Sequence, residues 1–414
     1  MRMVGVSMAK SKINNEIQGT SQGAFEPIAI IGLSCILPDS PDIETFWQNV
    51  LNAKVSISEI KTERWGNIAD FYDSEGSPGS VKENMTYSKI GGFVEGFEFD
   101  WRRWRQPPGT LKQIDISQQW AVEASASALE HAGYGDGGKE LPNASTGVIF
   151  ANALGGENRG YTTMLIHEKE AIRIAKESGM TDEAEFIRKW RDNRPVVNED
   201  TMPGELANVV AGRVANLLDL QGPNYTTDAA CATSMAALLD SCRQLQSRQV
   251  DVALCGASDR TMDPASYVKF SAIGALSATH STPFDSGANG FVMGEGSGVM
   301  VLKRLSDAIT DGDTIYSVVR GIGASSDGRG KGITAPSQRG QMQAVARAYS
   351  QSGYSATTVE LVEAHGTSTK VGDATELGTL SKFFAEVPSG ENIAVGSIKS
   401  QIGHLKAAAG MAGM

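Results

Sequence analysis

The chain has 414 residues, of which 41% are hydrophobic, 21% are charged and 46 are glycine. This length fits two to three domains or one large two-lobed unit. The formal net charge of −11 argues against nucleic acid as the main partner, because binding a phosphate backbone requires a basic face. A local basic groove for an acidic carrier is still compatible with that charge.

The four cysteines, Cys35, Cys231, Cys242 and Cys255, form no CxxC pair and no cluster with histidine in the sequence. We therefore expect no disulfide framework and no metal site, and the pattern fits a reducing, cytoplasmic compartment. No apolar run approaches the length of a membrane span, and the first residues lack the apolar core of a signal peptide. Residues 1–25 are polar and are predicted to be a disordered tail or linker.

The first part of the chain predicts strands and helices around one irregular segment. A short strand over residues 28–31 is closed by Gly32, and apolar side chains at helical spacing follow over residues 43–51. Residues 55–100 combine turn residues and aromatics with little periodicity, so we expect an extended excursion with one hairpin. The next predicted elements are a strong amphipathic helix and a core strand, at residues 114–133 and 147–153.

The rest of the chain alternates between helices and strands. A polar helical stretch at residues 164–193 is interpreted as an insertion between core elements, and a core-like helix follows at 206–217. Later helices and strands are expected from 264, at 296–305, 314–325, 337–352 and 359–365, after Asp373 and at 392–398. Such alternation is typical of an α/β protein with largely parallel sheets, and the shared rhythm of the two halves indicates an internal duplication.

Cys231 stands where a turn of small residues becomes a helix, within residues 222–258. At a helix N-terminus the unpaired backbone N–H groups and the positive end of the macrodipole favour a thiolate, which is the nucleophilic form of cysteine. The alternative for this stretch alone is a small thiol packed in the core between alanines.

Two histidines stand in a suggestive pattern. His365 directly follows an apolar strand, and His404 follows a strand, a lysine and a glycine. Parallel α/β proteins place their chemistry at the ends of such strands, so these histidines and Cys231 are predicted to form one site. The remaining histidines have no such setting and are interpreted as surface or capping residues: His131, His167 and His280.

Four motifs in this order resemble those of β-ketoacyl-acyl carrier protein synthases. They are DAACATS around Cys231, PFDSGANGFVMGEGSG at 283–298, HGTSTKVGDATE at 365–376 and GSIKSQIGHLKAAAG at 396–410. The segment from Pro203 to Ser234 is especially similar to the ketosynthase domains of type I polyketide and polyunsaturated-fatty-acid synthases. The resemblance runs from about Glu26 to the last residue.

This resemblance implies a thiolase-like α/β fold, with two duplicated βαβαβαββ halves stacked in five αβαβα layers, and a homodimer. Residues 26–276 would form the half that carries the nucleophile, and 277–414 the half that carries both histidines. Family members continue beyond the last motif with a helix, a strand pair and a glycine-rich turn. We therefore expect the second half to be incomplete at its C-terminal end.

The resemblance also implies a reaction. Cys231 would accept an acyl chain from the 4′-phosphopantetheine arm of an acyl carrier protein. His365 and His404 would promote decarboxylation of a malonyl-carrier thioester and stabilise the resulting enolate, giving a decarboxylative Claisen condensation. No tightly bound cofactor is implied, and other domains of a multidomain synthase are expected partners.

Supporting roles follow from the same motifs. The resemblance implies that Lys399 and Glu376 support the histidines through an ion-pair network, and that Thr367 and Thr369 bind the pantetheine arm. Ser368 stands where many members have glycine. The sequence of residues 107–134 resembles iterative, lipid-type synthases more than modular polyketide synthases.

Two other functions are weighed against condensation. Thiolase-like cleavage or hydrolysis at Cys231 is disfavoured by the pair of histidines, since thiolases pair cysteines with one histidine. A non-condensing, structural or docking domain of a megasynthase is the alternative from a different class. Such domains typically lose the nucleophile or the first histidine, and this chain keeps Cys231, His365 and His404.

Overall fold

The computed structural model describes residues 25–135, 137–192, 194, 196–330, 332–385 and 392–414. The tail expected over residues 1–25 lies outside the described residues except for its last position. Among the described residues, no helix is long and apolar enough to cross a membrane.

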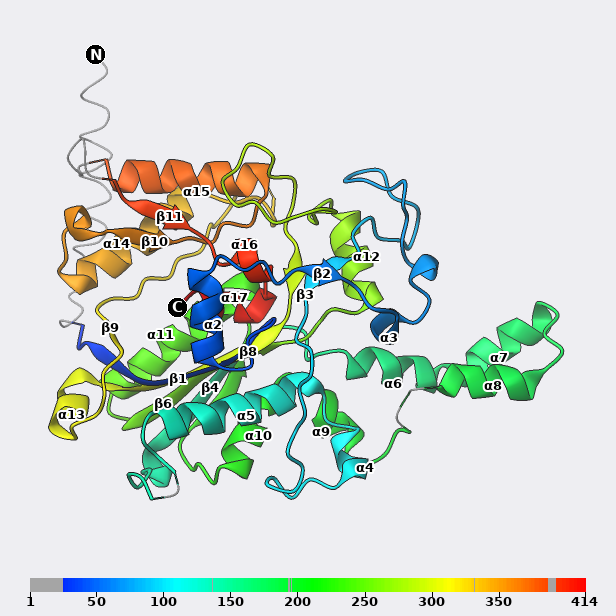
Figure 1. Cartoon of the computed structure of the whole chain (residues 1–414), viewed down its shortest axis with the longest axis horizontal. Coiled ribbons are helices and arrows are strands. Elements are labelled where there is room, and N and C mark those ends of the chain that lie inside the picture. The colour runs from blue at the N-terminus through cyan, green and yellow to red at the C-terminus, as the bar shows by residue number, and fades with distance from the viewer. Residues whose placement is uncertain (1–24, 136, 193, 195, 331, 386–391) are drawn as a thin grey trace, which may run out of the picture.

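A six-stranded sheet forms the centre of the molecule (Figure 1). Its strands in spatial order are β5 (Asn224–Thr227), β4 (Thr146–Ala151), β6 (Val252–Asp259), β8 (Gly296–Arg304), β1 (Ile28–Ile36) and β9 (Ser317–Val319). Strand β4 pairs in parallel with β5 and β6, whereas β8 runs antiparallel to both β6 and β1. The sheet is therefore mixed: the expected parallel direction holds for β5, β4, β6 and β1, and β8 and β9 reverse it.

Side chains alternate between two cores along the strands of this sheet. Val148 and Phe150 point into the core beneath α5 (Ile116–His131) and α10 (Val209–Leu217). Ile149 and Ala151 point into the opposite core. That second core is covered by α11 (Thr233–Gln246) and α17 (Ala409–Gly413). This alternation, with period two, makes the sheet a divider between two helical layers.

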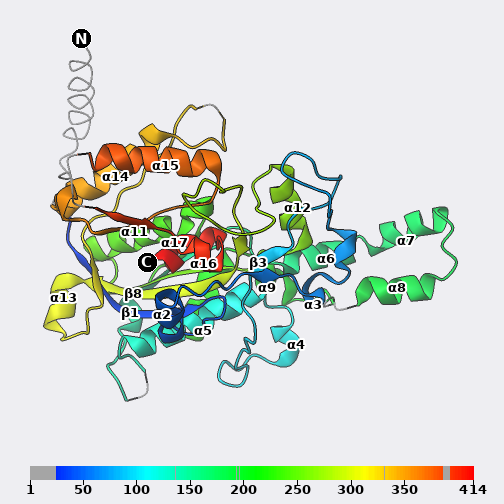
Figure 2. The same cartoon turned by 45° about the horizontal axis from the view of Figure 1, so that its top comes forward.

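A second, smaller sheet lies on the far side of α11. Strands β10 (Leu361–Glu363) and β11 (Ala394–Gly396) pair in parallel, and α14 (Gln338–Ser352) and α15 (Lys370–Phe383) lie on their outer side (Figures 1 and 2). The layers thus follow the expected order α, β, α, β, α. The boundary at residue 276 between two halves stays a prediction, and β8, which follows it, runs in the six-stranded sheet.

The irregular segment expected at 55–100 does contain one antiparallel strand pair, β2 (Ser58–Glu59) with β3 (Ile90–Gly92). Strand β3 continues in parallel to β7 (Met293–Gly294), and Met293 also bridges to His404. This small sheet therefore lies directly beside the loop that carries a predicted site residue.

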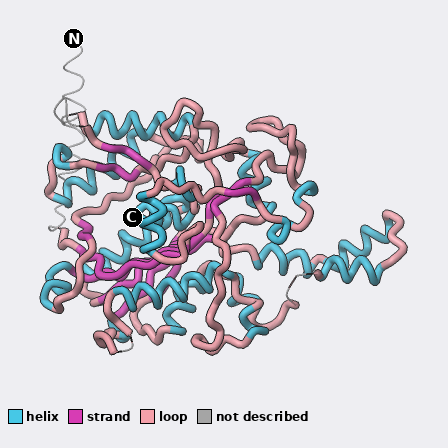
Figure 3. The backbone as a smooth tube through the Cα atoms, viewed as in Figure 1, coloured by secondary structure: helices cyan, strands magenta, loops and turns pink. Residues whose placement is uncertain are grey.

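The polar insertion forms a helical arm that projects from the body (Figures 1 and 3). It begins with α6 (Asn158–Ile166) and continues as α7 (Glu168–Glu177) and α8 (Glu183–Arg191), neither of which has a buried residue. The remaining helical segments are α2 (Ile43–Leu51), α3 (Thr62–Trp65), α4 (Pro108–Leu111), α9 (Thr201–Glu205), α12 (Pro264–Ala272), α13 (Leu305–Thr310), α16 (Lys399–Ile402), and 3₁₀ turns at Ile68–Asp70, Asn143–Ser145, Ala230–Ala232, Ala356–Thr358 and Lys406–Ala408.

Two sequence predictions about these elements were wrong in detail. Strand β1 does not end at Gly32 but passes it through a bulge and continues to Ile36. Glycine suits this position because a Cβ would lie 2.5 Å from the carbonyl oxygen of Ala128. Helix α5 is not amphipathic but buried almost all round. Its polar side chains mimic an exposed face in the sequence, yet Gln118 Nε2 donates to the carbonyl oxygen of Gly204 at 3.0 Å.

Candidate active site

Cys231 lies between the end of β5 and the start of α11, in the 3₁₀ turn Ala230–Ala232. Ala230 has φ 51°, a left-handed conformation that is uncommon for a residue with a side chain. The carboxylate of Asp228 accepts the Ala230 N–H at 2.8 Å and holds this turn. The turn presents Cys231 as an exposed residue, so the interpretation of a thiol buried between alanines is wrong.

The structure brings the three predicted site residues together. One ligand-type atom from each of Cys231, His365 and His404 lies within 4.8 Å of the other two. The two imidazole rings meet edge to face, with centroids 5.6 Å apart. They arrive from different elements: His365 follows β10, and His404 follows α16.

The protonation pattern of His404 follows from its hydrogen bond. The ring is buried, and its Nδ1 accepts the backbone N–H of Lys406 at 2.9 Å. A neutral imidazole with Nδ1 as acceptor carries its proton on Nε2. Burial holds the pKa of His404 well below its usual value, and the charge of Lys399 acts in the same direction. His404 is therefore a neutral ring that offers an Nε2–H donor.

Glu376 holds the backbone at His365. Its two carboxylate oxygens accept the N–H groups of His365 and Gly366, at 2.7 and 2.8 Å. Desolvation lowers the pKa of His365 to about 4, and the charge of Lys399 adds to that effect. Both histidines are consequently neutral at physiological pH, which suits hydrogen-bond donation to a developing negative charge.

Burial and nearby charges act on the thiol in opposite directions. Desolvation raises the pKa of Cys231, whereas Lys399 and Lys406 act to lower it. The net direction is upward, which differs from the thiolate expected from the helix N-terminus alone. Lys399 is buried, and desolvation lowers its pKa while Glu363 and Glu376 oppose that shift. Among the described residues, Lys399 forms no direct salt bridge, so its coupling to the carboxylates acts across a longer distance.

Thr367 and Thr369 lie in the loop after His365, with their hydroxyl oxygens 3.0 Å apart. Between them, Ser368 is fully buried at φ 61°, a left-handed conformation that favours glycine. The Ser368 backbone carbonyl accepts the N–H of Gly290, and its hydroxyl accepts the N–H of Thr282. These bonds join the threonine loop to the 283–298 motif.

Sequence reasoning missed two buried residues beside the site, Asp259 and Lys406. Asp259 ends the apolar strand β6, and Lys406 lies two residues after His404. A carboxylate that closes a buried strand and a lysine inside a histidine motif were the only signals available. Their contact depends on packing between two segments that are far apart in the sequence.

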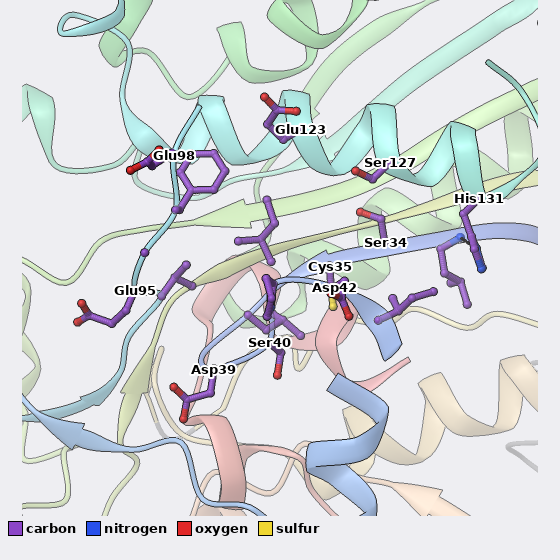
Figure 4. Close-up of a pocket in the computed structure, with 18 of the residues that line it drawn as sticks. Ser34, Cys35, Asp39, Ser40, Asp42, Glu95, Glu98, Glu123, Ser127 and His131 are labelled. Carbon is purple, nitrogen blue, oxygen red and sulfur yellow. Dashed lines mark hydrogen bonds between the residues drawn. The ribbon is translucent and has the colours of Figure 1, made fainter. Parts of the chain in front are cut away.

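A cavity of about 700 Å³ lies elsewhere, between β1, α2 and α5 (Figure 4). Its polar lining is mainly acidic and includes Asp39, Asp42, Glu95, Glu98, Glu123 and His131. None of the three clustered site residues lines it, so it is distinct from the candidate site. The Cys231, His365 and His404 cluster has a spacing that a divalent ion could accept, but the positive charges of Lys399 and Lys406 disfavour a cation there.

Comparison with known proteins decides the family. The model of the β-ketoacyl synthase N-terminal domain matches residues 25–308, and that of the C-terminal domain matches residues 316–414. The chain belongs to the β-ketoacyl synthase family. The predicted resemblance is thereby confirmed, and the family is one of acyltransferase-type enzymes.

Curated relatives of this ketosynthase chain are components of large synthases. It is 34% identical to a polyunsaturated fatty acid synthase protein of a Thraustochytrium species, over 94% of this chain and 14% of that protein. It is 34% identical to a phenolphthiocerol/phthiocerol polyketide synthase protein of Mycobacterium tuberculosis, over 94% of this chain and 23% of that protein. The chain thus spans less than a quarter of the length of either relative.

Solved ketosynthases confirm the thiolase-like fold. The oxazolomycin ketosynthase domain OzmH KS7 of Streptomyces albus superposes with a TM-score of 0.79 at 28% identity, covering 94% of this chain and 61% of that one. The PfaC keto synthase–chain length factor superposes with a TM-score of 0.82 at 29% identity, covering 94% and 41%.

Proposed function

We propose that the chain is a condensing ketosynthase that joins a Cys231-bound acyl group to a malonyl-acyl carrier protein, in polyketide or fatty acid biosynthesis. The observation that carries the proposal is the cluster of one accessible thiol and two neutral imidazoles within 4.8 Å. A nucleophile alone would serve hydrolysis or cleavage. Two neutral donors beside it suit a reaction in which an enolate forms next to an acyl-enzyme.

The first half-reaction is acyl transfer. The Cys231 sulfur, as thiolate, attacks the thioester carbonyl of an acyl chain held on a 4′-phosphopantetheine arm. The tetrahedral intermediate collapses, the pantetheine sulfur leaves and takes up the proton given by the Cys231 thiol, and a new thioester is left on the enzyme. The nearby charges of Lys399 and Lys406 favour the thiolate that this step needs.

The second half-reaction makes the carbon–carbon bond. The malonyl carboxylate leaves as carbon dioxide, and its bonding electrons move to the thioester carbonyl oxygen to form an enolate. The N–H groups of His365 and His404 donate hydrogen bonds to that oxygen. The enolate carbon attacks the acyl carbonyl on Cys231, the cysteine sulfur leaves, and a β-ketoacyl group remains on the carrier.

Supporting residues have defined places in this scheme. Glu376 holds the backbone of His365, and burial, reinforced by the charge of Lys399, keeps both histidines neutral. We assign the hydroxyls of Thr367 and Thr369 to the pantetheine arm, because they pair with each other in the loop directly after His365. The scheme uses no tightly bound cofactor.

The partners follow from the chemistry and from the relatives. Substrates reach Cys231 on an acyl carrier domain, and the length of the relatives supports further synthase domains as neighbours. The cysteine pattern, which has no disulfide framework, supports a cytoplasmic location. A homodimer is supported by β5, which lies at the end of the six-stranded sheet and, within the part of the chain that the structure describes, pairs on one side only.

The test uses an acyl carrier protein with a radiolabelled acyl chain and a malonyl carrier protein. The wild-type chain should become labelled at one thiol and then release carbon dioxide with formation of a β-ketoacyl carrier. Cys231→Ala should abolish labelling, whereas the matched variant Cys242→Ala, which removes a buried thiol of α11, should label normally. Label on the Cys231→Ala variant, or full decarboxylation by a His365→Ala, His404→Ala double variant, would overturn the proposal.

A further inference from the structure

Lys406 and Asp259 form a buried ion pair beside the candidate active site. Their side chains are 7% and 1% exposed, and Nζ of Lys406 lies 3.1 Å from Oδ1 of Asp259. The same Nζ donates to the carbonyl oxygen of Gly294 at 2.6 Å. Both charges are therefore paired within the protein, and the lysine side chain is anchored at two points.

This anchor holds an unusual backbone turn. Lys406 has φ 52°, a left-handed conformation that a residue with a long side chain rarely adopts without external support. In that conformation its N–H donates to Nδ1 of His404. The bond that places the proton of His404 on Nε2 thus depends on a backbone geometry that the Lys406 side chain holds in place.

Asp259 contacts the backbone of the same turn as well. Its Oδ1 also accepts the N–H of Thr261 at 3.0 Å, which orients the carboxylate at the end of β6. Its Oδ2 lies 3.4 Å from the backbone nitrogen of Ala407, which donates to it. The carbonyl oxygen of Ala407 in turn accepts the hydroxyl of Ser234, in the first turn of α11 after Cys231. One carboxylate therefore connects β6, the His404 turn and the helix of the nucleophile.

We propose that Lys406 and Asp259 are positioning residues that lock the turn at residues 404–407 and so hold His404 as an Nε2–H donor facing Cys231. This inference rests on the donor role proposed above for His404. The pair itself is buried within the protein and acts through the backbone of the turn and through its field.

The two charges act on the thiol in opposite directions, which separates this role from a merely structural one. Lys406 lowers the pKa of Cys231, and Asp259 raises it. The other groups that face this thiol are Lys399, from α16, and the neutral rings of His365 and His404. A variant that only loosens the fold would change thiol reactivity in one direction, whichever member of the pair is removed.

The test compares Lys406→Met, Asp259→Asn and the double variant, in the full chain, with Lys176→Met on the exposed face of α7 as control. The pH dependence of Cys231 alkylation by iodoacetamide should shift up for Lys406→Met and down for Asp259→Asn. The double variant should lie near wild type, and the control should not move.

Nitrogen-15 NMR of the histidine rings reports the tautomer directly. His404 should be an Nε2–H tautomer in wild type and a mixture of tautomers in Lys406→Met, with carbon dioxide release from a malonyl carrier falling roughly 100-fold. Alkylation shifts of the same sign in both single variants, or an unchanged His404 tautomer in Lys406→Met, would overturn the inference. If Lys406→Met fails to fold, the nearly isosteric Asp259→Asn serves as the test. An alkylation curve for Asp259→Asn that does not shift to lower pH would overturn the inference.

Failure of the proposed function gives a different result. Alkylation and NMR need no condensation, so the shifts described above would still be seen if wild type released no carbon dioxide. In that case the positioning pair would stand and the condensing role would fall.

Discussion

At the scale of single residues, protonation state decides what the two histidines can do. An imidazolium beside a malonyl group would bind its carboxylate and so stabilise the ground state, which opposes loss of carbon dioxide. A neutral ring with an N–H toward the thioester oxygen stabilises the enolate instead. Desolvation, reinforced by Lys399, keeps His365 and His404 in the neutral form.

This argument predicts an unusual pH profile for decarboxylation. The pKa of His365 is lowered to about 4, so the neutral, active form is present above that value and is lost as the pH falls through it. The rate of carbon dioxide release by the Cys231→Ala variant, which isolates this step, should therefore be flat from about pH 8 to pH 6 and fall only below about pH 5. Stopped-flow detection of carbon dioxide measures it.

The control for this profile is circular dichroism at each pH, which separates protonation of the site from acid unfolding. A midpoint near 6.5, the value of an ordinary histidine, in a chain that remains folded would contradict the desolvated, neutral pair.

The residues that meet could be predicted, but not their chemical state. Cys231, His365 and His404 were found from the sequence because each stands next to a strand or a helix start in a recognisable motif. Their pKa values depend on desolvation by segments that are distant in the sequence, so the direction predicted for Cys231 was wrong. The contact between Lys406 and Asp259 likewise exists only after β6 and the 404–407 turn have packed together.

At the scale of elements, the turn that enters α11 combines strain with local hydrogen bonds. Ala230 occupies the left-handed region, and the hydroxyl of Thr233 both accepts the N–H of Ala229 at 2.9 Å and donates to the carbonyl of Ala230. A non-glycine residue in this conformation costs about 1–2 kcal/mol, which the surrounding bonds must offset. These bonds keep Cys231 at the sharp junction of strand and helix.

Substitution at Ala230 should reveal this strain. Ala230→Gly relieves the strain but increases the conformational entropy that the unfolded chain loses on folding. These effects oppose each other, so the free energy of unfolding should stay within about 1 kcal/mol of wild type. Ala230→Val places a β-branched side chain in the left-handed region and should lower it by about 1–2 kcal/mol. Urea denaturation measures both. Ala237, which is buried inside α11, provides the control position. Ala237→Gly should clearly lower the free energy of unfolding, unlike Ala230→Gly, since it lowers helix propensity and leaves a small void.

A stabilising effect of valine at position 230 would contradict the left-handed turn.

Element boundaries near this site were otherwise predictable, because helix α11 and strand β6 follow clear periodicities. The bulge in β1 and the near-complete burial of α5 were not, since they depend on close packing between Gly32 and the Ala128 carbonyl and on glutamines that find partners in another segment. Periodicity reports which faces are apolar and does not report where a polar face finds its partners.

At the scale of the whole molecule, the six-stranded sheet ends in an exposed edge. The strand order could not be predicted from periodicity, because strands such as β8 and β6 are buried along their whole length and their apolar pattern carries no information on direction. The order places β5 at one end, where Tyr225 is 37% exposed. Carbonyls of Pro223 and Thr227 accept N–H groups from Val148 and Asn152, so by the period of two the backbone groups of Thr226 point away from β4.

An unpaired edge of this kind is a template for a second strand, and we expect it to mediate the homodimer. Thr226→Pro removes one outward N–H without touching the ladder to β4, and proline is tolerated on an edge strand. The variant should therefore remain folded and shift from dimer to monomer in sedimentation velocity. Thr226→Val keeps the N–H and loses only the hydroxyl, and it should remain dimeric. The backbone groups of Tyr225 face β4, so Tyr225→Pro should unfold the chain and serves as the control for an intact sheet. If Tyr225→Pro unfolds the chain but the dimer survives Thr226→Pro, the two copies meet elsewhere.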